Sequence, residues 1–241
     1  MAGDDTTPEG EQVNIYGNHV GSWNFAATAY LNRWKVKIYY EHYFDDHSQM
    51  FFQYGRWKDG HIGLEITFPK NRFIDTFVYE GLGTKDQTGP MLYDSFWGKF
   101  EEQISAKDNY YNHYLYQGWQ HWGMGIGNPL LPGPIYNKNG QITFISNRVL
   151  AHHIGFCGSP CQSLSYRMLL SYSRHWGTYD NPLNEIKKQF NSLFEVTYAP
   201  QQLKGWSFTV SGAMDRGNLL GNNYGGMLVI RKQGIIKSGN K

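Results

Sequence analysis

Alternation of apolar and polar side chains is the feature that most limits what this chain can fold into. Between Ser22 and Leu31 the odd positions from Trp23 onward are apolar, while the even positions include Asn24 and Thr28. A strand places successive side chains on opposite faces, whereas a helix repeats about every 3.6 residues. The pattern predicts an all-β, antiparallel fold of about nine strands, or ten if Val13–His19 also forms one. The other expected strands are Trp34–Phe44, His61–Phe68, Phe73–Glu80, Arg148–Phe156, Ser163–Ser173, Gln189–Tyr198, Gly205–Met214 and Asn223–Lys232.

The lengths of these strands and of their connections favour a transmembrane β-barrel. Most expected strands run for about 8–11 residues, which suits a tilted membrane-spanning strand, whereas strands in soluble domains typically have about 5–6. Short connections such as Asn32–Arg33 and Cys157–Gln162 alternate with long ones such as Gly81–Asn147 and Arg174–Lys188, as in outer-membrane barrels. A soluble β-sandwich explains the alternation equally well and stays open as the alternative.

Composition and known motifs exclude several classes of protein. Aromatic residues reach 17% and charged residues only 17%, which argues against disorder and against a helical bundle. The net charge of +2 predicts no nucleic-acid partner, and no apolar run is long enough for a membrane helix. No signal peptide is expected in the chain as it stands. Nucleophile-elbow, Walker, zinc-protease and dinucleotide motifs do not occur, so neither a cofactor nor a metal is expected.

The expected organisation is a polar N-terminal segment (1–12), a partial barrel (13–236) with a long loop at 81–147, and a polar tail (237–241). If the apolar strand faces meet lipid, the opposite faces line a polar lumen. The residues expected to face this lumen are Lys35, Lys37, Glu41, Glu65, Arg167 and Glu195.

The long loop is rich in aromatic residues. Its first part, Met91–Ile104, has the spacing of a short amphipathic helix. Further on, aromatic rings mix with amides, and tyrosine and tryptophan can stack on sugar rings while polar groups bond the hydroxyls. The carbohydrate-binding candidates are Tyr110, Tyr111, His113, Tyr114, Trp119 and Trp122. Alternatively, these side chains line or plug a barrel lumen.

The two cysteines, Cys157 and Cys161, lack the spacing of a thioredoxin or zinc motif. They form either a small disulfide loop or two free thiols near a turn.

Several segments, in order along nearly the whole chain, resemble the Wzi-like capsule assembly proteins in the form common in Bacteroides-type bacteria. They are Gly17–Phe25, Tyr39–Asp46, Asp59–Ile66, Thr84–Pro90, Asp108–His113, Gly125–Leu130, Asn147–Gly155 and Met227–Lys232. The resemblance implies a bacterial outer-membrane β-barrel, in contact with lipid, that binds capsular or other surface polysaccharide and has no enzymatic activity. Because the chain resembles the C-terminal half of such proteins, it also implies an upstream signal peptide and an N-terminal half or partner chain that completes the barrel. A non-lectin outer-membrane channel and a soluble β-sandwich carbohydrate-active enzyme are the alternative functions.

Overall fold

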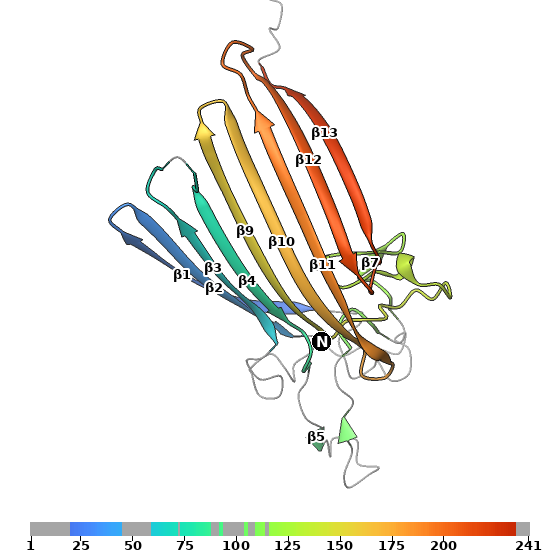
Figure 1. The fold of residues 1–241 in the computed structure, drawn as a ribbon. Helices are drawn as coiled ribbons and strands as arrows, with labels where there is room; N and C mark the ends of the chain where they lie inside the picture. The colour runs from blue at the N-terminus through green and yellow to red at the C-terminus, as the bar shows by residue number, and fades with distance from the viewer. Residues whose placement is uncertain are drawn as a thin grey trace, which may run out of the picture.

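The computed structural model describes residues 20–44, 59–71, 73–87, 92–93, 104–105, 109–113 and 116–234. Most of them belong to one antiparallel sheet of nine strands, which pair in chain order (Figure 1). The strands are β1 (Gly21–Leu31), β2 (Trp34–Phe44), β3 (Gly60–Thr67), β4 (Thr76–Gly83), β9 (Val149–Cys161), β10 (Leu164–Gly177), β11 (Pro182–Tyr198), β12 (Trp206–Gly217) and β13 (Asn223–Lys232). The expected all-β, antiparallel fold is confirmed, and all nine expected strands are present.

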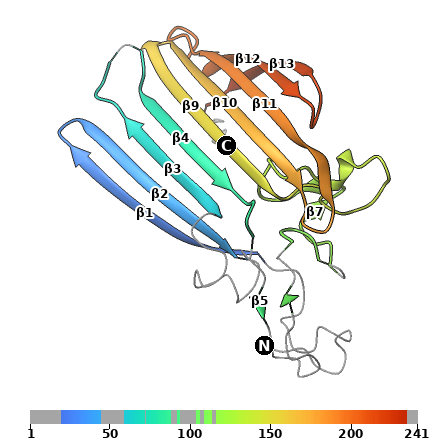
Figure 2. The same cartoon turned by 60° about the horizontal axis from the view of Figure 1, so that its bottom comes forward.

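The sheet is curved, and its two edge strands, β1 and β13, do not pair with each other (Figure 2). The described residues therefore form an open sheet and not a closed barrel. They also do not form the two packed sheets of a β-sandwich, because only two further ribbons of two residues per strand are present. The tenth candidate strand, Val13–His19, lies outside the described residues.

The segment between β4 and β9 contains short elements. Strand β5 (Leu92–Tyr93) pairs with β6 (Ile104–Ser105), and β7 (Gln120–His121) pairs with β8 (Met124–Gly125). A single 3-10 turn, η1, spans Pro134–Tyr136. The helix expected over Met91–Ile104 is wrong for the residues of this range that the structure describes. Leu92, Tyr93 and Ile104 belong to paired antiparallel strands. No helix in the described part of the chain is long and apolar enough to cross a membrane.

The strand register divides the sheet into two chemically distinct faces. We define the inner face as the one that carries Leu82, Val149 and Ala151, onto which the β4–β9 segment packs, and the outer face as its opposite. Every acidic residue at a paired position of the nine strands lies on the inner face. These residues are Glu41, Glu65, Glu80, Glu195 and Asp215.

The outer face is apolar and largely uncovered in the described structure. Its exposed large side chains include Trp23, Phe25, Leu31, Ile38, Ile62, Phe194, Val210, Leu228 and Ile230. The buried hydrophobic cluster lies instead against the inner face, where Tyr111, Leu131 and Phe144 pack on Leu82, Val149 and Ala151. The sheet therefore buries apolar surface on its inner face near one end and exposes it along its outer face.

The connections differ from expectation in the second half of the sheet. Residues 174–188 do not form a long loop, because β10 runs to Gly177, β11 begins at Pro182 and only residues 178–181 join them. The polar side chains of Arg174 and Lys188 suggested a loop, yet they pair across the ladder, since backbone pairing does not require apolar side chains. We call the end of the sheet with the β2–β3, β4–β9, β10–β11 and β12–β13 connections the loop end, and the other end the turn end (Figure 1).

Of the two alternatives for Cys157 and Cys161, the structure has the free thiols and no disulfide between them. The two residues belong to the same strand, β9, which runs to Cys161, so the expected turn is confined to residues 162–163. At about 3.3 Å per residue, positions four apart on a strand are separated by roughly 13 Å. A disulfide requires Cα atoms within about 7 Å.

Candidate functional site

A cavity of about 600 Å³ lies between the inner face and the β4–β9 segment, at the loop end of the sheet. Six neighbouring strands, from β1 to β10 in the order of the sheet, contribute polar side chains to one wall, and the β4–β9 segment supplies the other wall. The strand residues include Glu41 and Tyr43 from β2, His61 from β3, Glu80 from β4, His153 from β9 and Ser171 from β10. Tyr110, Tyr111 and residues 127–131 line the opposite side.

The strand wall centres on a histidine held between two carboxylates. In His61, Nδ1 lies 3.6 Å from Oε2 of Glu41, and Nε2 lies 3.5 Å from Oε1 of Glu80. The hydroxyl of Tyr39 donates a hydrogen bond to Glu80, and that of Tyr43 donates to Glu41 over 3.5 Å. Register explains this grouping, because Glu41 pairs with His61 across β2 and β3.

A second polar pair extends the wall across the next two strands. The register places His153 opposite Glu80 and also opposite Ser171, and His153 Nδ1 lies 2.6 Å from Ser171 Oγ. Carboxylates accept hydrogen bonds, while hydroxyls both donate and accept them. This wall therefore presents the mixture of groups that a ligand with many hydroxyls can use. Among the residues that the structure describes, no three His, Cys, Asp or Glu side chains are placed so that they could hold a metal ion together.

A buried carboxylate ties the two walls together. Asp59, just before β3, accepts hydrogen bonds from the backbone N–H groups of Asp86 and Gln87 and from the hydroxyl of Tyr110, over 3.3 Å. Burial raises the pKa of Asp59 to about 7, although the backbone donors act in the opposite direction. This carboxylate therefore links the start of β3, the segment after β4 and the aromatic wall.

The aromatic residues predicted to bind carbohydrate do not form one surface. Tyr110 and Tyr111 are buried at the cavity wall, and Tyr111 stacks on Trp119 with ring centroids 5.3 Å apart. Trp119 thus supports Tyr111 from behind and is absent from the cavity lining. Trp122 is 85% exposed and also lies outside the lining.

The remaining two aromatic candidates are His113 and Tyr114. His113 packs against the ring of Tyr116, with centroids 5.1 Å apart, and is not among the lining residues. Tyr114 lies outside the described residues. Among the predicted aromatic residues that the structure describes, only Tyr110 and Tyr111 line the cavity.

The residues expected to face a lumen all lie on the inner face, and four of them form ion pairs with one another. Lys35 Nζ is 3.5 Å from Glu65, and Arg167 is 3.3 Å from Glu195. Lys37 lies over the ring of Tyr39, and Glu41 belongs to the cavity. Of this set, only Glu41 reaches the cavity.

Sequence reasoning missed His61, Glu80, His153 and Ser171 as members of the site. Alternation would have placed His61 and Glu80 on the polar face, because each adjoins an outer-face residue, Ile62 and Tyr79 respectively. No sequence pattern indicated a role for Asp59 in the site, because Asp59-Gly60 has the composition of an ordinary turn.

A comparison with protein-family models found no matching family, and comparisons with curated proteins and with solved structures found no significant match.

Proposed function

We propose that this chain forms part of a bacterial outer-membrane β-barrel that binds capsular or other surface polysaccharide for capsule assembly or attachment. The observation that carries the proposal is the separation of acidic side chains from the exposed apolar side chains, which lie on opposite faces of the sheet. All acidic residues at paired strand positions lie on the inner face, while the outer face exposes a broad apolar surface.

The outer face has the chemistry of a surface covered by lipid. Soluble proteins seldom expose apolar patches larger than a few hundred Å², because such patches promote association. Strands β1 and β2 each have 11 residues and β13 has 10, which agrees with the roughly 9–11 residues of a spanning strand. At the turn end, Trp34 contacts Phe68 and Trp206 stacks on Phe208, as in an aromatic girdle.

The open edges of the sheet support a further part of the proposal. Unpaired backbone groups cannot sit in hydrocarbon, because no water is present to bond them. Strands β1 and β13 therefore require partner strands if the sheet lies in a membrane. We propose that an N-terminal half or a partner chain supplies them.

The inner-face cavity supports the polysaccharide part of the proposal. Its carboxylates and hydroxyls can bond sugar hydroxyls, and its tyrosine wall offers apolar ring surface. The β4–β9 segment covers the inner face at the loop end, so in the proposed barrel this end faces the cell exterior, where capsular polysaccharide is found.

The cavity can be tested with matched carboxylate variants of the complete outer-membrane protein. We expect Glu41→Gln combined with Glu80→Gln to weaken retention of capsular polysaccharide by about 10-fold or more, since hydrogen bonds to charged groups are lost. The control combines Glu65→Gln with Glu195→Gln, because these inner-face carboxylates lie outside the cavity lining. The control should retain polysaccharide as the parent does.

Unchanged retention in the correctly inserted cavity variant would refute the polysaccharide site. Conductance in planar bilayers without polysaccharide affinity would favour the alternative of a non-lectin channel. Turnover of a polysaccharide by detergent-free, monodisperse protein would favour the soluble enzyme and refute the membrane proposal.

A further inference from the structure

Basic side chains collect on the outer face at the loop end, directly beyond the apolar surface. Arg174 pairs with Leu150 on one side and with Lys188 on the other, and Arg216 lies opposite Phe190. Arg148 precedes Leu150 by two residues, so strand alternation places it on the same face. We call Lys85, Arg148, Arg174, Lys188 and Arg216 the basic stripe.

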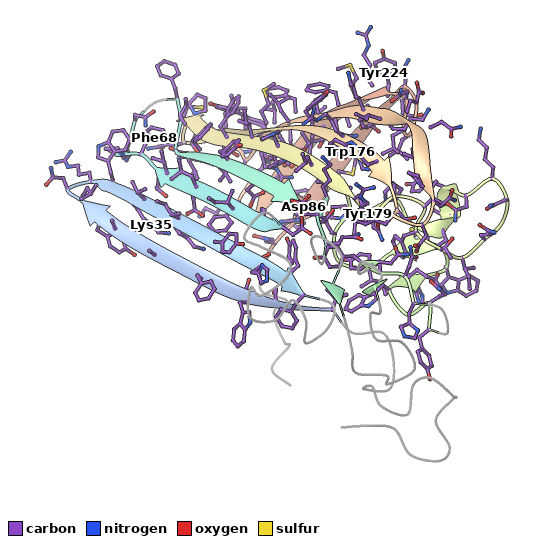
Figure 3. The ribbon with its side chains drawn as sticks, turned by 90° about the horizontal axis from the view of Figure 1, so that it is seen from below. Lys35, Phe68, Asp86, Trp176, Tyr179 and Tyr224 are labelled. Carbon is purple, nitrogen blue, oxygen red and sulfur yellow. The ribbon has the colours of Figure 1, made fainter. Side chains whose placement is uncertain are left out.

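Aromatic rings hold three cations of the stripe in place. Lys85 Nζ lies 4.9 Å and Arg174 Cζ 5.3 Å from the ring centroid of Trp176. Arg148 Cζ lies 3.8 Å from the ring of Tyr179, and its Nε donates a hydrogen bond to the carbonyl of Lys85 over 3.2 Å. Figure 3 views the sheet from this end and labels Trp176 and Tyr179. The stripe is therefore an organised set of side chains.

The stripe lacks ion-paired carboxylates among the residues that the structure describes. Within the part of the chain that the structure describes, no ion pair joins a carboxylate to Lys85, Arg148 or Arg174. Two cations sharing the ring of Trp176 repel each other, and a bound anion would relieve this repulsion. Arginine is especially suited to phosphate, because its planar guanidinium can donate two parallel hydrogen bonds.

The position of the stripe indicates the source of the anion. Tyr172 and Phe190 form the next outer-face row toward the middle of the sheet. Arg216 lies in this row, and Arg174 and Lys188 lie beyond it. Aromatic residues mark the boundary between hydrocarbon and headgroups in membrane proteins, so the stripe lies at headgroup depth in the proposed barrel. The turn end differs, since Lys232 is the only charged residue at a paired outer-face position there, and it lies over Trp206.

We propose that the basic stripe binds the phosphate groups of the phosphorylated glycolipid in the outer leaflet of the outer membrane. This inference rests on the membrane part of the proposed function. A soluble acidic polysaccharide is the less suitable ligand, because the stripe is on the outer face and the cavity proposed for polysaccharide is on the inner face.

Binding can be measured with the complete protein in phosphatidylcholine nanodiscs. Purified phosphorylated glycolipid is added, and the bound molecules are counted by native mass spectrometry. A second arm uses the same glycolipid after enzymatic removal of its phosphates. We expect Arg148→Gln combined with Arg174→Gln to weaken binding of the phosphorylated form by about 25-fold, because each cation near a membrane surface contributes roughly a five-fold factor. Lys232→Gln is the matched control, since it removes a cation next to an aromatic ring at the opposite end.

Each outcome decides the proposal. Weaker binding in the double variant, with the control unchanged and the dephosphorylated glycolipid bound poorly, supports it. Equal binding by the inserted double variant overturns it. Equal competition by inorganic phosphate or by a soluble acidic polysaccharide also overturns it, because the site would then not select a lipid. Failure of the parent protein to insert into bilayers refutes the membrane proposal itself, which distinguishes that failure from the loss of this site.

Discussion

Replacing Val210 by lysine places a charge in the central part of the exposed outer face. Val210 lies near the middle of β12, opposite Val196 on β11 and Leu228 on β13, and is 61% exposed in the described structure. If lipid covers this face, the exposed part of the valine contributes about 1 kcal/mol through its contact with hydrocarbon. A lysine at the bilayer midplane adds a cost of about 2–4 kcal/mol.

The expected loss of folding free energy is therefore about 3–5 kcal/mol. If water covers the outer face, the same exposed substitution should change stability by no more than about 0.5 kcal/mol. The matched control is Ala213→Lys, because Ala213 is also exposed and close to the middle of β12 but lies on the inner face, opposite Leu193 and Gly225. Coverage of the outer face by lipid and coverage by water thus predict clearly different stabilities for this pair of variants.

The measurement is denaturant titration of the complete protein in phosphatidylcholine vesicles, followed by tryptophan emission. We expect Val210→Lys to shift the folding equilibrium far more than Ala213→Lys does. Equal stability of the two variants, each within about 0.5 kcal/mol of the parent, would refute the assignment of the outer face to lipid.

Three further outcomes follow from the described contacts. Because burial raises the pKa of Asp59 to about 7, the folded state holds this proton more tightly than the unfolded chain. Stability should therefore fall as the pH rises from about 4 through 7, and thermal unfolding of Asp59→Asn should lack this component; an identical pH profile in both proteins would contradict it. Trp119→Ala should lower stability by about 3 kcal/mol, since Trp119 stacks on buried Tyr111, whereas Trp122→Ala should change it by less than about 0.5 kcal/mol in the same denaturant titration. Cys157 and Cys161 should both react with a thiol reagent after denaturation without a reductant, and a protein with no titratable thiol would show that they are bridged.

Local patterning was sufficient to predict the strands and their faces. Glu65 and Arg167 lie on the inner face and Phe194 on the outer face, because alternation along a strand depends only on neighbouring residues. The predicted ends of the strands were less accurate. Arg174 and Lys188 are polar, yet the backbone ladder continues through both residues. Prediction from hydropathy alone therefore placed the ends of these two strands too early.

The sequence by itself thus determined that the chain forms long antiparallel strands with one polar and one apolar face. Only the tertiary structure decided which side chains meet. Tyr110 reaches Asp59 across 51 positions of the sequence, and strand register brings His61 between Glu41 and Glu80. Such contacts depend on pairing and on the path of the β4–β9 segment over the inner face. Side-chain alternation is local and leaves both undetermined, which is why the cavity could not be read from the sequence.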